Sequence, residues 1–137
     1  MPLDVGIRSE AREVVTRENT AVAYGSGGVE VYATPAVVAL LERAAVAAVE
    51  PHLEAGKTTV GTRVDVKHLA ATPVGFQVRA VVELVQVEGR RLVFRAEVYD
   101  EVEKVAEGTH ERFVVDLERF LQKALTKRRG ENPPGTT

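Results

Sequence analysis

A helical segment that is apolar on nearly every side constrains the fold of this chain more than any other feature. Residues 35–49 are almost entirely Ala, Val and Leu, and only Glu42 and Arg43 interrupt them. Thr34 precedes the segment as a possible N-cap and is followed by a proline, while Pro51 stops it. The segment is too short and too charged to span a bilayer. A helix without a continuous polar face must be covered on most sides, so we expect it at the centre of the molecule.

The sequence after Gly56 changes from helical to alternating periodicity, which is typical of half-buried strands. The even-numbered residues from Val60 to His68 share one largely apolar face, and Gly61 belongs to the opposite, polar face. Turn residues such as Glu88-Gly89-Arg90 join neighbouring strands by short connections, which requires antiparallel pairing. The predicted strands comprise residues 60–70, 76–84, 92–99 and 104–115.

The predicted elements fit one α+β domain. A weaker run of Val and Ala among charges predicts a further strand within residues 10–23, and residues 117–125 have the spacing of a short C-terminal helix. A curved antiparallel sheet of about five strands would wrap round the long central helix, which is the hotdog architecture. The 137 residues, 45% of them hydrophobic, suit a single domain over residues 1–126, followed by a disordered tail, residues 127–137.

Composition excludes several classes of function. The net charge of −2 lacks the positive excess on which most nucleic-acid-binding proteins rely, so we expect no nucleic-acid partner. The lack of Cys excludes disulfides, a thiol nucleophile and Cys-based metal sites, and the three His residues lack metal-ligand spacing. We therefore expect no metal. No stretch suits a membrane partner and the first residues lack the pattern of a signal peptide, so the expected location is the cytoplasm.

Three polar side chains fall where the pattern predicts burial. Glu42 interrupts the apolar helix, where a carboxylate is costly unless it is paired or hydrogen-bonded. The alternatives to a functional role are that its carboxylate extends to solvent or forms an ion pair with Arg43 at a subunit contact. His68 can exchange a proton near neutral pH, although a lone His on an apolar face is more often a core residue. Thr34 is explained by capping, and it could also act as a nucleophile or as a donor at the positive end of the helix.

Other positions carry weaker signals. His52 follows the helix and is expected to be exposed, and the alternation around His110 is too mixed to place its side chain. Gly25, Gly27 and Gly28 lack the strand–glycine–helix context of a nucleotide-binding loop. We interpret these glycines as part of a flexible loop.

Six short segments have a familiar order and spacing. They are Tyr32-Ala33-Thr34, Leu40-Leu41-Glu42-Arg43-Ala44, Val60-Gly61-Thr62, His68-Leu69-Ala70-Ala71-Thr72-Pro73, Val87-Glu88-Gly89-Arg90-Arg91-Leu92 and Gly108-Thr109-His110-Glu111-Arg112. Together they resemble the fluoroacetyl-CoA thioesterase family of hotdog proteins, over roughly residues 30–120.

The resemblance implies a set of site residues. It implies that Thr34, Glu42 and His68 are catalytic and that Gly61 and Arg112 contact the substrate. Gly61 would allow close approach of the acyl group, and Arg112 would either meet a CoA phosphate or hold the site together. The resemblance also implies a homodimer, or a higher oligomer, with sites at the subunit interface. No cofactor is expected, because coenzyme A is part of the substrate.

The expected activity is hydrolysis of an acyl-CoA to a free carboxylic acid and CoA. Family members specific for fluoroacetyl-CoA carry Phe in the loop before the catalytic Thr, whereas residues 25–29 read Gly-Ser-Gly-Gly-Val, so we expect a short-chain acyl-CoA. Either Thr34 is the nucleophile, activated by His68 and Glu42, or Glu42 attacks or activates water. The alternatives are a non-catalytic acyl-CoA-binding protein and a hydratase or dehydratase acting on β-hydroxyacyl thioesters.

Overall fold

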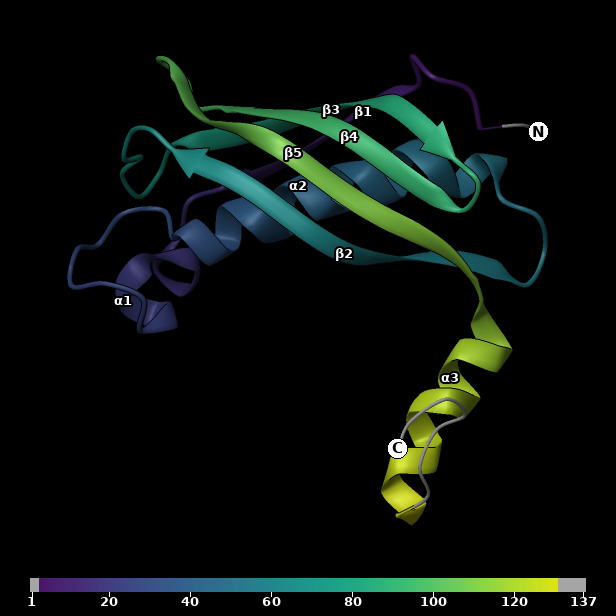
Figure 1. Cartoon of the computed structure of the whole chain (residues 1–137). Helices are drawn as coiled ribbons and strands as arrows, with labels where there is room; N and C mark the ends of the chain where they lie inside the picture. The colour runs from purple at the N-terminus through teal and green to yellow at the C-terminus, as the bar shows by residue number, and fades with distance from the viewer. Residues whose placement is uncertain (1–2, 131–137) are drawn as a thin grey trace.

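The computed structural model describes residues 3–130 and contains a five-stranded antiparallel sheet in the order β1-β3-β4-β5-β2. The sheet curls over helix α2 (Thr34–Val49), which lies along its concave face (Figure 1). The predicted α+β architecture, a curved sheet around one long helix, is confirmed. The strands are β1 Arg8–Val14, β2 Lys57–His68, β3 Gln77–Glu88, β4 Arg91–Tyr99 and β5 Lys104–Asp116.

Helix α2 buries one side against the sheet and leaves the other side uncovered in the single chain. It packs mainly against β1 and β3 and has few contacts with β2. The helix passes into a short turn, η2 (Glu50–His52), where Pro51 ends it as predicted. The expectation that this helix is covered on most sides is therefore met only in part by the chain itself. The exposed positions of this helix are Thr34, Pro35, Ala39, Arg43, Val46 and Ala47.

Strand β2 contains a β-bulge between Gly61 and Arg63, which changes the predicted alternation. Before the bulge, Thr59 is buried and the open side of Gly61 faces Glu42 on α2. After the bulge, even-numbered residues point inward and His68 is half-buried, as predicted. The prediction that Gly61 lies on the outer face is therefore wrong, because an extra residue in the strand interrupts the period of two.

The segment between β1 and α2 differs from the strand predicted over residues 10–23. Strand β1 ends at Val14, and the Thr20 hydroxyl accepts a hydrogen bond from Ala23 N at 3.3 Å, which caps a one-turn helix. Gly25, with φ of 71°, ends that turn in the left-handed region. Local capping here overrides the weak strand pattern. The two short elements are η1 (Arg17–Asn19) and α1 (Ala21–Tyr24).

The predicted C-terminal helix is present as α3 (Leu117–Leu125), which projects beyond the sheet at the end of β5 (Figure 1). A short turn, η3 (Thr126–Arg129), follows it. The predicted tail begins within η3, and its residues 131–137 lie outside the described residues. Over residues 3–130, none of the helices has the length and hydropathy needed to cross a membrane.

Gly108 provides a test of how β2 is held to the sheet. It pairs with Val66 of β2, and a Cβ at this position would overlap the backbone of Asp65 and Val66. We expect Gly108→Ala to lower the free energy of unfolding by about 1–3 kcal/mol, the usual cost of overpacking, as measured by urea denaturation. The exposed neighbour Glu107→Ala is the control and should change it by less than about 0.5 kcal/mol. Equal stabilities of the two variants would contradict the assignment.

Candidate active site

Thr34 and His68 form a hydrogen-bonded pair at the N-terminal end of α2. Thr34 Oγ1 lies 2.7 Å from His68 Nδ1, at the end of β2. Thr34 is the first residue of the helix, Ala33 occupies the N-cap position, and no side chain caps this end. The interpretation of Thr34 as a cap is therefore wrong, because its hydroxyl contacts the imidazole instead of the backbone of the first turn.

This pair borders a cavity of about 320 Å³. Burial lowers the pKa of His68 below its ordinary 6.5, so the imidazole is neutral at neutral pH. A neutral imidazole next to a hydroxyl is the arrangement in which His takes a proton from an oxygen nucleophile. The cavity is lined by Ala21, Ser26, Val31, Tyr32, Thr34, His68, Leu69, Ala70 and Ala71, so the predicted glycine-rich loop contributes Ser26 to it.

Glu42 lies two turns further along α2 and pairs with Arg112 of β5. Glu42 Oε2 is 3.2 Å from Arg112 Nη1, and the Glu42 side chain is 37% exposed. Arg43, the partner considered from the sequence, pairs within the chain with Glu13 at 3.4 Å. Strand β5 therefore supplies the cation that compensates a carboxylate on an apolar helix.

Arg112 is 6% exposed, and its guanidinium donates to groups of this chain in almost every direction. Nε donates to the Thr59 hydroxyl at 2.9 Å, and Nη2 donates to the Thr59 carbonyl at 3.0 Å. Nη1 lies 3.1 Å from His110 Nε2 and 3.2 Å from Glu42 Oε2. Four of the five N–H donors of the guanidinium are thus committed within the chain. This geometry favours a role in holding the site together over contact with a CoA phosphate.

Gly61 leaves the space that the Glu42 carboxylate fills. A Cβ on Gly61 would overlap Glu42 Oε2 and would lie 3.2 Å from Arg112 Nη1 and 3.3 Å from His110 Cε1. The pair between Glu42 and Arg112 therefore requires a residue without a side chain at this point of β2. The resemblance alone pointed to Gly61, because nothing in the alternation of the strand distinguishes it.

His110 belongs to the same cluster and was missed by the sequence analysis. Its side chain is fully buried and lies two residues before Arg112 on β5, on the same face of the strand. Residues two apart on a strand share a face, so the position two residues before the candidate Arg112 could have identified His110. Among residues 3–130, His, Asp and Glu side chains form no group of three suited to holding a metal ion.

The structure thus divides the predicted site residues between two clusters. One is Thr34 with His68, and the other is Glu42 with Arg112 and Gly61. Thr34 and Glu42 are eight residues apart on the helix, which corresponds to about 12 Å along its axis. No hydrogen bond or ion pair joins Glu42 to His68 within residues 3–130, so a Thr–His–Glu triad does not form inside one chain.

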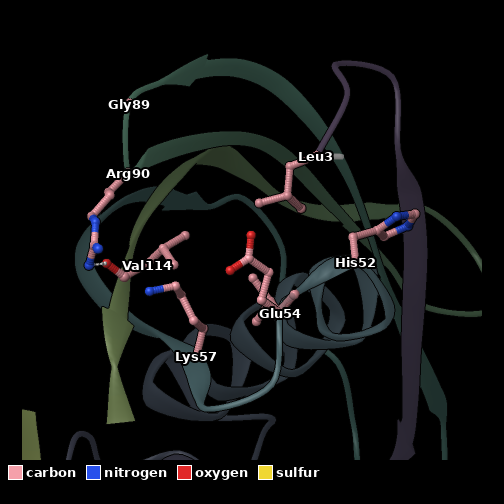
Figure 2. A pocket seen from close by; sticks show the side chains of 8 residues that line it. Leu3, His52, Glu54, Lys57, Gly89, Arg90 and Val114 are labelled. Atoms are coloured by element: carbon pink, nitrogen blue, oxygen red, sulfur yellow. Dashed lines mark hydrogen bonds between the residues drawn. The ribbon is translucent and has the colours of Figure 1, made fainter. Parts of the chain in front are cut away.

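Of the cavities that do not include Thr34, two lie along α2 or at its C-terminal end. One, of about 540 Å³, lies over the open side of α2 and includes both Glu42 and Arg112 in its lining. The other, of about 410 Å³, lies at the C-terminal end of α2 (Figure 2). His52, which lines it, was expected to be exposed but is half-buried, and its Nδ1 atom is buried. None of the five predicted site residues lines this last cavity, whose lining is Leu3, His52, Leu53, Glu54, Lys57, Gly89, Arg90 and Val114.

Comparison with known proteins identifies the family. The family described as "Fluoroacetyl-CoA-specific thioesterase" matches residues 15–118. A protein named fluoroacetyl-CoA thioesterase from Streptantibioticus cattleyicolor is 47% identical over 98 residues, which cover 72% of this chain and 70% of that protein.

Solved structures agree with this match. The fluoroacetyl-CoA thioesterase FlK superposes with a TM-score of 0.85 at 39% identity, over 97% of this chain and 100% of that one. A hot-dog-like protein from Thermanaerovibrio acidaminovorans superposes with a TM-score of 0.83 at 30% identity, over 93% of this chain and 94% of that one. The chain therefore belongs to the fluoroacetyl-CoA-specific thioesterase family of hotdog-fold proteins.

Proposed function

We propose that this protein is an acyl-CoA thioesterase that hydrolyses a short-chain acyl-CoA to the carboxylic acid and free CoA. The observation that carries the proposal is the 2.7 Å contact between Thr34 Oγ1 and His68 Nδ1 beside a cavity of about 320 Å³. Membership of a thioesterase family supports the same reaction class. The location proposed from the sequence is the cytoplasm.

Thioester hydrolysis needs an activated oxygen nucleophile and stabilisation of the oxyanion. In one route, Thr34 attacks the carbonyl carbon while its proton passes to His68, and the CoA thiolate leaves with that proton; water then cleaves the acyl-enzyme. Backbone N–H groups at the start of α2 are suited to stabilise the oxyanion. In the other route, Glu42 attacks or activates water, while Thr34 and His68 hold the carbonyl.

The functional unit we propose is a homodimer in which each site combines residues of both chains. The two clusters do not meet within one chain, and α2 exposes Ala39, Val46 and Ala47 around Glu42. Strand β2 forms an edge of the sheet, and such an edge favours pairing with a second copy. In this arrangement Thr34 and His68 of one chain face Glu42 of the partner subunit.

We propose a small acyl group that needs no fluorine. The relative at 47% identity is named for fluoroacetyl-CoA, but the loop over the Thr34 cavity contributes Ser26 and contains no aromatic residue. A loop without aromatic side chains offers little apolar surface to discriminate between small acyl groups. Acetyl-CoA and other short-chain acyl-CoAs are therefore the first substrates to test.

The release of free thiol from a panel of acyl-CoAs, followed with a thiol reagent, tests the reaction. We expect hydrolysis of short-chain members. Glu42→Gln should lower kcat of the folded enzyme by at least about 100-fold, and it should also lower the melting temperature, because Arg112 loses the carboxylate that offsets its buried charge. His52→Ala, which lines a separate cavity, is the control and should keep the wild-type kcat. Wild-type rates in Glu42→Gln would exclude both routes. Double-bond formation would indicate a hydratase or dehydratase, and binding without turnover would indicate a binding protein.

The pH dependence of kcat/KM tests the role of His68 as a base. A base must be neutral, so activity is present above the pKa of His68 and is lost as the pH falls through it. Because burial lowers that pKa, the acid limb should have its midpoint below pH 6.5. His68→Ala should abolish the activity, and His52→Ala should leave the limb in place. A midpoint above 6.5 would contradict a buried His68 base.

Mixing two inactive variants tests whether the site spans two chains. Thr34→Ala and Glu42→Gln are unfolded together and refolded as a mixture. If Thr34 acts with Glu42 of the partner subunit, each mixed dimer has one intact site, and the mixture should recover about a quarter of wild-type activity. If the site lies within one chain, the activity of the mixture stays at the level of the separate variants. That result, or an active monomer in sedimentation, would exclude the shared site.

A further inference from the structure

His110 lies in the middle of β5 with both ring nitrogens bonded to the protein. Its side chain is fully buried, and its ring stacks on Phe94 of β4 with centroids 6.0 Å apart. Nδ1 lies 2.8 Å from the backbone carbonyl of Arg63. Because a carbonyl oxygen can only accept a hydrogen bond, Nδ1 carries the proton.

The other nitrogen of His110 must then be an acceptor. Nε2 is 3.1 Å from Nη1 of Arg112, and a guanidinium can only donate. The imidazole is therefore neutral, with its proton on Nδ1 and its Nε2 lone pair directed at Arg112. Protonation of Nε2 would place an N–H against the guanidinium N–H and would break this contact.

The contact with His110 determines where the Arg112 guanidinium can point. Two sides of the planar group are held by the Thr59 hydroxyl and carbonyl, and His110 takes one of the two Nη1 hydrogens. The remaining Nη1 hydrogen points at Glu42 Oε2, 3.2 Å away. Without an acceptor at the Nε2 position, the guanidinium would lose the bond that directs this hydrogen to Glu42.

We propose that His110 is a positioning residue, which in its neutral Nδ1–H form directs Arg112 and thereby sets the position of the Glu42 carboxylate for catalysis. The catalytic part of this proposal rests on the proposed thioesterase function. His110 has no free nitrogen with which to transfer a proton, so it acts through Arg112 and does not touch the substrate.

The charges around His110 are compatible with a neutral ring. Burial lowers the pKa of His110, and the nearby charge of Arg112 lowers it further. The Arg63 carbonyl, Glu42 from α2 and Glu111 from β5 raise this pKa, but the net effect is a lowering. On strand β4, the uncharged Phe94 ring stacks on it. The ring should therefore be neutral at neutral pH, as His68 is.

Two conservative variants separate the two nitrogens. The amide of His110→Asn reaches the Nδ1 position and can still donate to the Arg63 carbonyl, but it offers nothing at the Nε2 position. His110→Gln reaches the Nε2 position and restores an acceptor for Arg112. We expect His110→Asn to lower kcat by about 10- to 100-fold with little change in KM, the effect of a misplaced catalytic group. His110→Gln should recover most of the lost kcat.

A merely structural role would give a different result. If His110 only fills space, both variants lower the melting temperature and leave kcat of the folded enzyme unchanged, which would overturn the proposal. A kcat of His110→Gln as low as that of His110→Asn would overturn it as well. A crystal structure of each variant measures the distance between Glu42 and Arg112 directly. It should exceed hydrogen-bonding distance in His110→Asn and be restored in His110→Gln.

Nitrogen-15 NMR of the imidazoles tests the tautomer without reference to activity. The chain has three His residues, so the His110 signal is assigned by the loss of one set in His110→Gln. At neutral pH we expect a protonated Nδ1 and an unprotonated Nε2, and the reverse tautomer or an imidazolium would overturn the proposal. If wild-type protein releases no thiol from any acyl-CoA, the proposed function fails, whereas the NMR and crystallographic results still decide whether His110 directs Arg112 and Glu42.

Discussion

The buried guanidinium of Arg112 joins the three parts of the molecule on which the candidate site depends. It lies on β5, bonds twice to Thr59 on β2 and pairs with Glu42 on α2. Removing a charge from water costs several kcal/mol, which only a nearly complete set of partners can offset. Glu42 supplies the one negative charge in direct contact with Arg112 among the described residues. Glu42, whose carboxylate is expected to act on the substrate, thus also offsets the free-energy cost of burying Arg112. Both the fold and the proposed site therefore need this carboxylate.

The distribution of the site along α2 follows from how the helix is covered. The sheet covers one side of α2, chiefly through β1 and β3, whereas β2 is held mainly by β5. This leaves an open face on the helix, with Glu42 in the middle and Thr34 at the end. An apolar helix with an open face is incomplete as a folded unit, and in the homodimer that we propose a second copy of the chain would cover it and bring the two clusters together. Formation of the proposed dimer would then complete both the core and the site.

The central helix, the hairpins and the family could be predicted from the sequence because each rests on a local pattern that is strong in this chain. The two-residue period cannot detect a bulge, so the inward orientation of Gly61 was missed. The hydroxyl of Thr34 was expected to cap the helix because capping is local, whereas its actual partner, His68, is 34 residues away. His110 could not be placed, since its role depends on strand pairing and on Arg112, neither of which the alternation of one strand reveals.

We propose different roles for two histidines with lowered pKa values, and their hydrogen bonds distinguish them. His110 has both nitrogens committed, one to a carbonyl and one to a guanidinium, so its protonation would break a contact on which Glu42 depends. His68 has Nδ1 paired with the Thr34 hydroxyl, so in the neutral ring that accepts from this hydroxyl the proton is on Nε2 and the Nδ1 lone pair is directed at Thr34. A group that exchanges protons needs a lone pair that can be protonated without disrupting the site. His68 meets this condition and His110 does not, which supports the proposal that proton transfer occurs at the Thr34 end of the helix and that His110 positions Arg112 and Glu42.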